Sequence, residues 1–250
     1  MEDDVKAPRR YDSSWRKEQA RLTQREILRA AHDLFINKGY GRTTMVDVAQ
    51  AAGVSVETVY GAFRNKATLL HRVWDVTIGG DDEEIAYHER PEVQALLVEP
   101  DLSRRLAAQA ALFTATARRI VPLVLAIQGA AASESAAADM LAEIGRQRLH
   151  GMSFMARAAA ATGELAVSEE ECRDLMWATT DGILWQRLVN DLGWTDDRFK
   201  AWLGMMWTRM LVAPTREGSE DPGLVGPAGQ DRGFPIGDAP APDQAGQERA

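Results

Sequence analysis

The segment over residues 43–66 constrains the fold most strongly, because it encodes two short helices joined by a tight turn. Thr44 is placed to cap the first helix, and the aspartate three residues later completes a Thr-x-x-Asp capping box. Gly53 follows the last apolar residue of that helix, where a left-handed backbone is least costly for glycine. Ser55 then caps the second helix. The pattern predicts a helix-turn-helix over about residues 44–63.

Each short helix has apolar residues at the spacing of one buried face. These residues are Val46, Val48, Ala49 and Ala52 in the first helix, and Val59, Ala62 and Phe63 in the second. A helix of about eight residues is not stable alone in water. A scaffold must therefore hold the second helix, which leaves its other face free.

The free face has residue types that read DNA in the major groove. Glu57 can accept a hydrogen bond from cytosine N4, and Val56 or Thr58 can contact a thymine methyl group. Tyr60 and Lys66 suit phosphate contacts, and the threonine pair that starts the first helix offers another phosphate site. The predicted DNA-binding residues are Arg42, Thr43, Thr44, Ser55, Val56, Glu57, Thr58, Tyr60 and Lys66. An ordinary pair of core helices would have the same geometry, so the neighbouring residues must decide.

The neighbouring residues favour the DNA reader. A Thr-x-x-Glu capping box at Thr23 predicts a helix that runs to Gly39, and Asn65 predicts another that runs to Ile78. Residues 22–78 resemble the N-terminal domain of the TetR/AcrR family of transcriptional regulators. The matching positions include Ile27, Leu28, Ala30, Ala31, Leu34, Phe35, Gly39, Tyr40, Thr43, Thr44, Val48, Ala49, Ala52, Gly53, Val54, Ser55, Thr58, Val59, Tyr60, Phe63, Asn65, Lys66, Leu69 and Leu70. The chain departs from the family in Gly61, where a larger residue is common, and in Asn65, where serine is usual.

No part of the chain reads as a series of strands, so the fold class is all-α. The resemblance implies an N-terminal three-helix helix-turn-helix DNA-binding domain and a larger C-terminal helical domain for ligand binding and dimerisation. The predicted parts are a flexible arm over 1–20, the DNA-binding domain over 21–80, the C-terminal domain over 81–212 and a disordered, Pro- and Gly-rich tail over 213–250.

The charge distribution agrees with a DNA-binding N-terminal domain. The chain has a net charge of −8, but residues 5–72 have a net charge of +7 and residues 73–250 one of −12. A basic domain on an acidic body suits a protein whose body stays away from the duplex. Chance asymmetry is the alternative explanation.

The C-terminal domain is expected to consist of long helices. Asp101 opens one that Pro122 should kink or divide, and another follows over about 136–161. A Ser-x-x-Glu capping box at Ser168 predicts a helix that runs to about Leu192 and is apolar on two faces. A shorter helix is expected over 91–98, and a last one after Thr195.

The resemblance implies a homodimer formed by the last two helices, and a small-molecule effector that enters the C-terminal domain and moves the helix over 65–78. Five of the seven tryptophans lie within 177–207, which agrees with an interface there. The predicted interface residues are Trp185, Leu188, Trp202, Met206 and Met210. The predicted pocket residues are Phe113, Arg118, Met140, Met152, Met155, Met176 and Trp177, with Arg119 and Asp181 as further polar groups.

Other chemistry finds little support in the sequence. Cys172 is the only cysteine, and the four histidines are scattered, so neither an intramolecular disulfide nor a metal site is expected. No cofactor, membrane span or signal peptide is expected either, which predicts a cytoplasmic protein. The leading hypothesis is a ligand-released homodimeric repressor that binds double-stranded DNA at a near-palindromic operator. The alternatives are an all-α interaction module or an enzyme without DNA-binding activity, although no catalytic grouping is recognisable.

Overall fold

A computed structural model describes residues 13–214 with the exception of 82 and 84. The first twelve residues of the predicted arm, and all of the predicted tail over 213–250 except its first two residues, lie outside this range. The described residues belong to one compact unit.

The described residues are helical, apart from turns and one isolated β-bridge between Leu165 and Val212. The all-α prediction is therefore confirmed. The helices are α1 (Ser13–Asn37), α2 (Met45–Ala52), α3 (Val56–Phe63), α4 (Lys66–Gly79), η1 (Tyr87–Glu89), α5 (Pro91–Val98), α6 (Leu102–Gln128), α7 (Ser135–Ala160), α8 (Glu169–Thr179), α9 (Ile183–Trp185), the π-helical η2 (Gln186–Asp191) and α10 (Asp196–Leu211).

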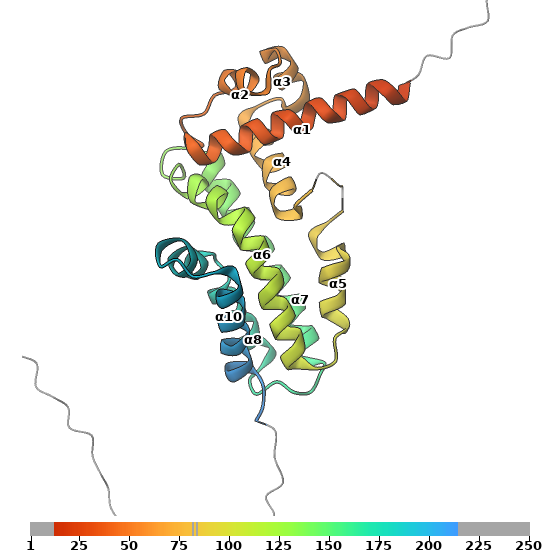
Figure 1. Ribbon diagram of the computed structural model, residues 1–250, viewed down its shortest axis with the longest axis vertical. Helices are drawn as coiled ribbons and strands as arrows, with labels where there is room; N and C mark the ends of the chain where they lie inside the picture. Colours follow the sequence, from red (N-terminus) through yellow and green to blue (C-terminus); the bar gives the residue numbers. More distant parts are fainter. Residues whose placement is uncertain (1–12, 82, 84, 215–250) are drawn as a thin grey trace, which may run out of the picture. The chain divides into compact units, whose positions relative to one another are not determined.

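Helices α1 to α4 pack around a core that continues into the rest of the unit. Phe35, Val59 and Leu69 belong to the same buried cluster as Ile127 of α6 and Met140 of α7. In Figure 1, α2 and α3 lie on one side of α1, and the near ends of α6 and α7 approach it from the other. The helix-turn-helix is thus supported by residues far away in the sequence.

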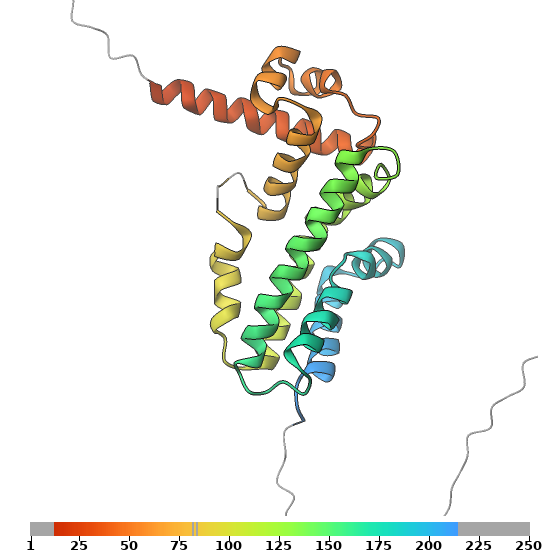
Figure 2. The ribbon, with the colours of Figure 1, turned by 180° about the vertical axis from the view of Figure 1, so that it is seen from behind.

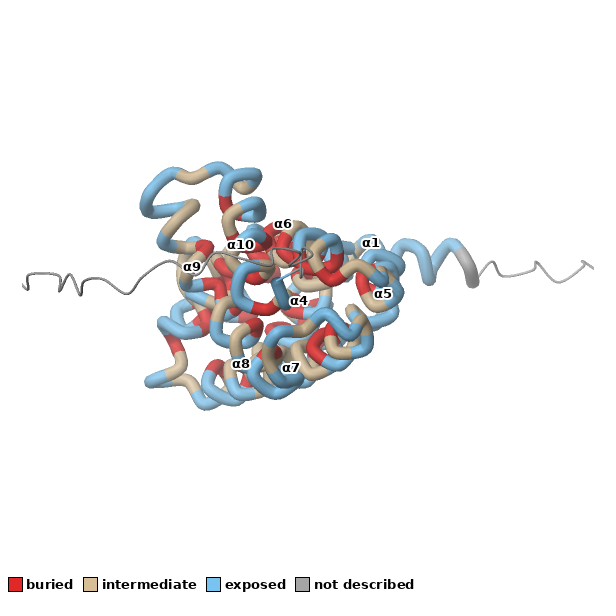
Figure 3. Tube along the Cα trace, turned by 90° about the horizontal axis from the view of Figure 1, so that it is seen from below, coloured by how far each residue is buried: buried red, intermediate tan, exposed pale blue. Residues whose placement is uncertain are grey.

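Helix α6 is the central element of the remaining helices, with α10 and α7 packed along it (Figure 2). Its contact with α10 is close at Gly204, where an added Cβ would lie 3.3 Å from the Cα of Ala107. A second buried cluster fills the space between these helices and includes Leu106, Phe199 and Trp207. Figure 3 shows these buried positions gathered in the interior of the bundle.

Helix α6 is long and apolar enough to cross a membrane by length and composition alone. The sequence reading missed this property. The helix instead packs against α1, α4, α5, α7 and α10. Its place at the centre of the bundle accounts for its apolar composition.

The first helix starts earlier than the sequence predicted. α1 begins at Ser13, and the hydroxyl of Thr23 donates a hydrogen bond to the carbonyl one turn earlier, so Thr23 lies inside the helix. The predicted flexible arm over 1–20 is therefore wrong from Ser13 onward. Exposed ion pairs such as Glu18–Arg21, at 2.8 Å, support this turn. The hydrophobic period begins only after these residues and did not indicate them.

Pro122 does not divide the long helix. α6 runs without interruption from Leu102 to Gln128. Proline removes only one N–H from the helical ladder, and Val121 and Leu123 beside it are buried in the two cores. Tertiary packing therefore maintains the helix through the proline.

The helix predicted over 168–192 is interrupted. α8 ends at Thr179, and Gly182 has a φ of 91°, which starts a separate turn leading into the π-helical segment. An added Cβ at Gly182 would lie 2.7 Å from Cγ2 of Val121. Glycine is needed here both for its backbone conformation and for the close approach of α6.

We expect Gly182→Ala to lower the free energy of unfolding by about 2 kcal/mol, because it adds a strained φ and a steric clash. Gly145→Ala is the matched control, since an added Cβ in the interior of α7 meets nothing within 4 Å. That change should stabilise the helix by about 0.5–1 kcal/mol. Urea denaturation followed by circular dichroism measures the stability of both variants. Equal effects of the two substitutions would contradict this explanation of the helix interruption at Gly182.

Candidate nucleic-acid interface

Helix α2 begins at the predicted capping box, which is complete. The Thr44 hydroxyl accepts from the Asp47 N–H at 3.1 Å, and the Asp47 carboxylate accepts from the Thr44 N–H at 2.8 Å. Lys38, in the turn directly after α1, donates to the same carboxylate at 2.6 Å. The hydrogen bond from Lys38, followed by those from Thr44, lowers the pKa of Asp47 to about 2. The carboxylate is therefore ionised at neutral pH, and it ties α2 to the end of α1.

The turn between α2 and α3 has the predicted geometry. Gly53 has a φ of 67°, in the left-handed region, and its N–H donates to the Gln50 carbonyl at 3.3 Å. The Ser55 hydroxyl accepts from the Thr58 N–H at 3.2 Å and caps α3. The two caps and the glycine fix the angle between the helices.

Helix α3 is anchored on one face and open on the other. Val59 and Phe63 are buried, whereas Glu57, Thr58 and Tyr60 are exposed, Tyr60 by 49%. An added Cβ at position 61 of the same helix would meet nothing within 4 Å. Glu57 and Thr58 belong to the N-terminal half of the helix, which is the half that reaches base edges in helix-turn-helix proteins.

Glu57 is a hydrogen-bond acceptor at the start of α3. Its own backbone N–H, followed by the Ser55 hydroxyl, holds the pKa of Glu57 below its ordinary value. The side chain is therefore ionised at neutral pH, and it suits the amino group of cytosine. A phosphate would repel this carboxylate. Glu57 is therefore better suited to select a base than to strengthen binding to the DNA backbone.

Two residues at the start of α2 differ from the prediction in their exposure to solvent. Thr43 is 1% exposed, and its hydroxyl donates to the carbonyls of Gly39 at 2.9 Å and Leu34 at 3.3 Å. Its side chain cannot contact DNA, so that prediction is wrong. Val46 was predicted to be buried but is 58% exposed, and Met45 takes the buried place. An eight-residue helix has too few apolar positions to fix its phase from the sequence.

Lys66 does not extend freely from the helix-turn-helix. Its Nζ donates to the Tyr40 carbonyl at 3.3 Å, lies 4.3 Å from the centre of the Tyr40 ring, and forms an ion pair with Glu134 at 3.6 Å. Burial, followed by the charge of Glu134, raises the pKa of Tyr40 to about 12. Lys66 therefore ties the start of α4 to the α6–α7 connection, a contact that the sequence did not indicate.

Arg64 is an exposed cation that the sequence reading did not select. It follows α3 directly and has a φ of 57°, an uncommon value for a residue with a side chain. Its N–H donates to the Tyr60 carbonyl at 2.8 Å. Its position directly after the second helix of the helix-turn-helix could have indicated Arg64 as a candidate DNA contact. Arg42, which was predicted, is also exposed, and its Nε donates to the Lys38 carbonyl at 2.7 Å.

Known proteins share this arrangement. Residues 27–73 match the family model described as bacterial regulatory proteins, tetR family. The helix-turn-helix segment is therefore similar to that of TetR-family regulators. The chain is 41% identical over 59 residues to the HTH-type transcriptional regulator TtgR of Pseudomonas putida, and 33% identical over 61 residues to the HTH-type transcriptional regulator AcrR of Shigella flexneri. Each match covers 24% of this chain and 28% of the relative.

The fold of the chain also matches solved structures beyond this segment. NalD, the secondary repressor of the MexAB-OprM multidrug efflux pump in Pseudomonas aeruginosa, aligns with a TM-score of 0.56 at 19% identity, over 80% of this chain and 100% of NalD. The SmeT–triclosan complex aligns with a TM-score of 0.55 at 20% identity, over 84% of this chain and 100% of SmeT. At this level of identity the likeness concerns the fold.

The predicted pocket residues do not come together in one cavity. Met140 belongs to the core of the N-terminal helices, whereas Met155 and Met176 are buried in the second core. Trp177 is 38% exposed and has the guanidinium of Arg148 over its ring. The remaining predicted residues are Phe113 and Met152, packed against the second core, and Arg118, whose side chain is 72% exposed. Apolar character alone does not distinguish a cavity wall from a packed core.

The predicted dimer residues divide into two groups. Trp185 is 4% exposed and donates to Asp196, so it is part of the protomer core and was assigned wrongly. Met210 is 37% exposed. The others, Leu188, Trp202 and Met206, are partly buried against the second core. The exposed Met205 of α10 adds an apolar residue that was not selected.

We expect Thr43→Val to lower the free energy of unfolding by about 1–2 kcal/mol, because it removes a buried hydroxyl that donates to the carbonyls of Gly39 and Leu34. The matched control is Thr68→Val on the exposed surface of α4, which should change stability by less than roughly 0.5 kcal/mol. Chemical denaturation measures both variants. An unchanged stability of Thr43→Val together with weaker DNA binding would restore the role of Thr43 as a DNA contact.

Proposed function

We propose that this chain is a sequence-specific DNA-binding transcriptional regulator, and that it acts as a homodimeric repressor which a small-molecule effector releases from DNA. The carrying observation is the exposed N-terminal half of α3, held by the caps at Thr44 and Ser55 and by the buried anchors Val59 and Phe63. The match over 27–73 to the TetR family supports this proposal.

A two-fold dimer would place two copies of α3 in successive major grooves, about 34–36 Å apart on a near-palindromic site. The net charge of +7 over residues 5–72 supports attraction of this domain to phosphates, and the net charge of −12 over residues 73–250 supports a position of the body away from the duplex. A DNA-binding regulator of this kind would act in the cytoplasm. NalD is described as a repressor, which supports the proposed sign of regulation.

We expect the exposed residues of α3 to separate into two roles. Glu57→Gln and Thr58→Ala should change which half-site is preferred, by about 1–3 kcal/mol for the affected base pair. Tyr60→Phe should weaken binding to all sequences alike, because phosphate contacts carry no sequence information. Selection of bound sites from random DNA gives the preferences, and band shifts give the affinities.

Thr68→Ala, on the exposed side of α4, serves as the control for these variants. Identical behaviour of all three α3 variants would contradict the separation of roles. Absence of any salt-sensitive, sequence-specific binding by the natural chain would overturn the proposed function itself, and would favour an interaction module if the dimer persisted.

We expect Met210→Glu to shift the protein from dimer to monomer, because it places a charge on the apolar exposed side of α10. Gln128→Glu adds the same charge at the exposed end of α6 and should leave the dimer intact. Sedimentation velocity measures the oligomeric state, and the monomer should bind a full operator less tightly than the dimer. A dimer that is unaffected by Met210→Glu would place the interface elsewhere.

A further inference from the structure

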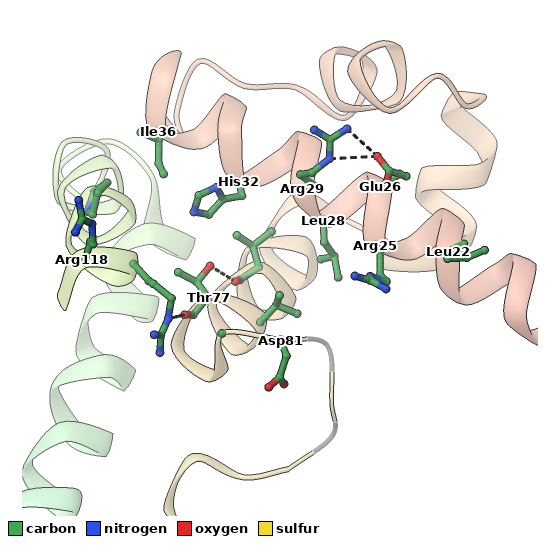
Figure 4. Close-up of a pocket in the computed structure, with 15 residues that line it drawn as sticks. Leu22, Arg25, Glu26, Leu28, Arg29, His32, Ile36, Thr77, Asp81 and Arg118 are labelled. Carbon is green, nitrogen blue, oxygen red and sulfur yellow. Dashed lines mark hydrogen bonds and ion pairs between the residues drawn. The ribbon is translucent and has the colours of Figure 1, made fainter. Parts of the chain in front are cut away.

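A cleft of about 670 Å³ lies where α1, α4 and α6 meet. Its volume falls in the range of small-molecule sites. Its apolar lining comes from Leu22, Leu28, Ile36, Val73, Val76 and Pro122. Its charged and polar lining includes Arg25, Arg29, Arg118, Arg119 and His32. Figure 4 shows Leu28, Arg25 and His32 directed from α1 toward the space that α4 and α6 border.

The carboxylates of this cleft are already engaged. Glu26 pairs with Arg29 of the same helix at 2.8 Å. Asp81 accepts two hydrogen bonds of 2.8 Å from Arg90, which does not line the cleft. Positive charge therefore prevails over negative charge along the lining.

Arg119 is the group best placed to bind an anion. It donates to the carbonyls of Thr77 at 3.2 Å, Ile78 at 3.1 Å and Ala115 at 3.3 Å, and it forms no ion pair with a described carboxylate. A guanidinium has five N–H donors, so these three bonds leave two for a ligand. Its hydrogen-bond partners are neutral carbonyls, and the nearby carboxylate of Asp81, on which its charge acts, is hydrogen-bonded to Arg90 instead. Arg-carboxylate pairs are often bidentate and geometrically specific.

We infer that this cleft is the effector site and that it takes an amphiphilic carboxylate, with the carboxylate on Arg119 and the hydrocarbon body against Leu28, Val73 and Pro122. This inference rests on the proposed function for its regulatory part. The site lies at the junction of the N-terminal helices with α6. Of the pocket residues predicted from the sequence, only Arg118 and Arg119 line it.

The contacts of Arg119 connect this site to the DNA-reading helix. Thr77 and Ile78 belong to the last turn of α4, and α4 starts at Lys66, three residues after the end of α3 at Phe63. A carboxylate that draws the guanidinium toward itself competes with these two carbonyls and loosens the hold of α6 on α4. The ligand then favours the state with the altered α4, provided that it binds this state more tightly.

The test uses hexanoate, octanoate, decanoate and dodecanoate as probes, with the corresponding alcohols as uncharged controls. Isothermal titration calorimetry on the full chain without DNA measures binding directly. Band shifts with the selected operator then measure how each probe changes DNA affinity. We expect at least one carboxylate to bind about tenfold or more tightly than its alcohol, as one charge-assisted pair predicts.

Three variants make the test specific to the cleft. Arg119→Gln should weaken carboxylate binding about tenfold and leave alcohol binding unchanged. Ile36→Trp narrows the apolar part without altering a charge and should weaken both classes of probe. Arg104→Gln, an exposed arginine at the other end of α6, is the control and should change neither. Circular dichroism establishes that each variant is folded.

Tight binding of a carboxylate that is lost in Arg119→Gln and in Ile36→Trp, and that lowers DNA affinity in the natural chain, supports the inference. Failure of every carboxylate to bind, or binding that neither variant changes, overturns it. If a carboxylate binds in the cleft but does not change the affinity of the protein for DNA, the cleft is not an effector site. If the protein binds its operator specifically but responds to no carboxylate, the inference about the cleft fails while the proposed DNA-binding function stands. Failure of the inference is therefore distinguishable from failure of the proposed function.

Discussion

The position of the DNA-reading helix depends on the burial of Val59 and Phe63 in a core that also holds Leu123, Ile127 and Met140. α3 has only eight residues, so its own hydrogen bonds do not stabilise it. The buried face provides the stability, and the exposed face is then available for DNA. Because part of that core belongs to α6 and α7, the orientation of α3 is set jointly by residues from distant parts of the described chain.

Polar contacts reinforce this joint core at two separate places. Lys66, one residue after the cap of α4, pairs with Glu134 in the connection between α6 and α7. Arg119 binds the carbonyls at the other end of α4. α4 is therefore fastened to the body at both of its termini, and a change at either end alters the platform on which α3 rests. This arrangement would connect a ligand bound at Arg119 to the proposed DNA-reading helix through the single helix α4.

The sequence predicted those parts of the fold that short-range chemistry determines. The caps at Thr44, Ser55 and Asn65 were correct because each hydrogen bond joins residues only three positions apart. The break at Gly182 was missed because its cause is Val121, a residue distant in the sequence. The burial of Thr43 was missed for a similar reason, since its hydroxyl binds carbonyls at the end of α1.

The same distinction explains why the candidate effector site was harder to predict than the DNA-reading face. Methionines and aromatics in the body were natural pocket candidates, yet they pack into cores, where adaptable side chains also fill space well. The cleft instead forms where three helices of different directions meet, and its arginines come from segments separated by some ninety residues. Among these arginines, Arg119 is distinguished by its hydrogen bonds to neutral carbonyls at the end of α4. That property depends on the positions of its neighbours in space, so no sequence pattern could have indicated it.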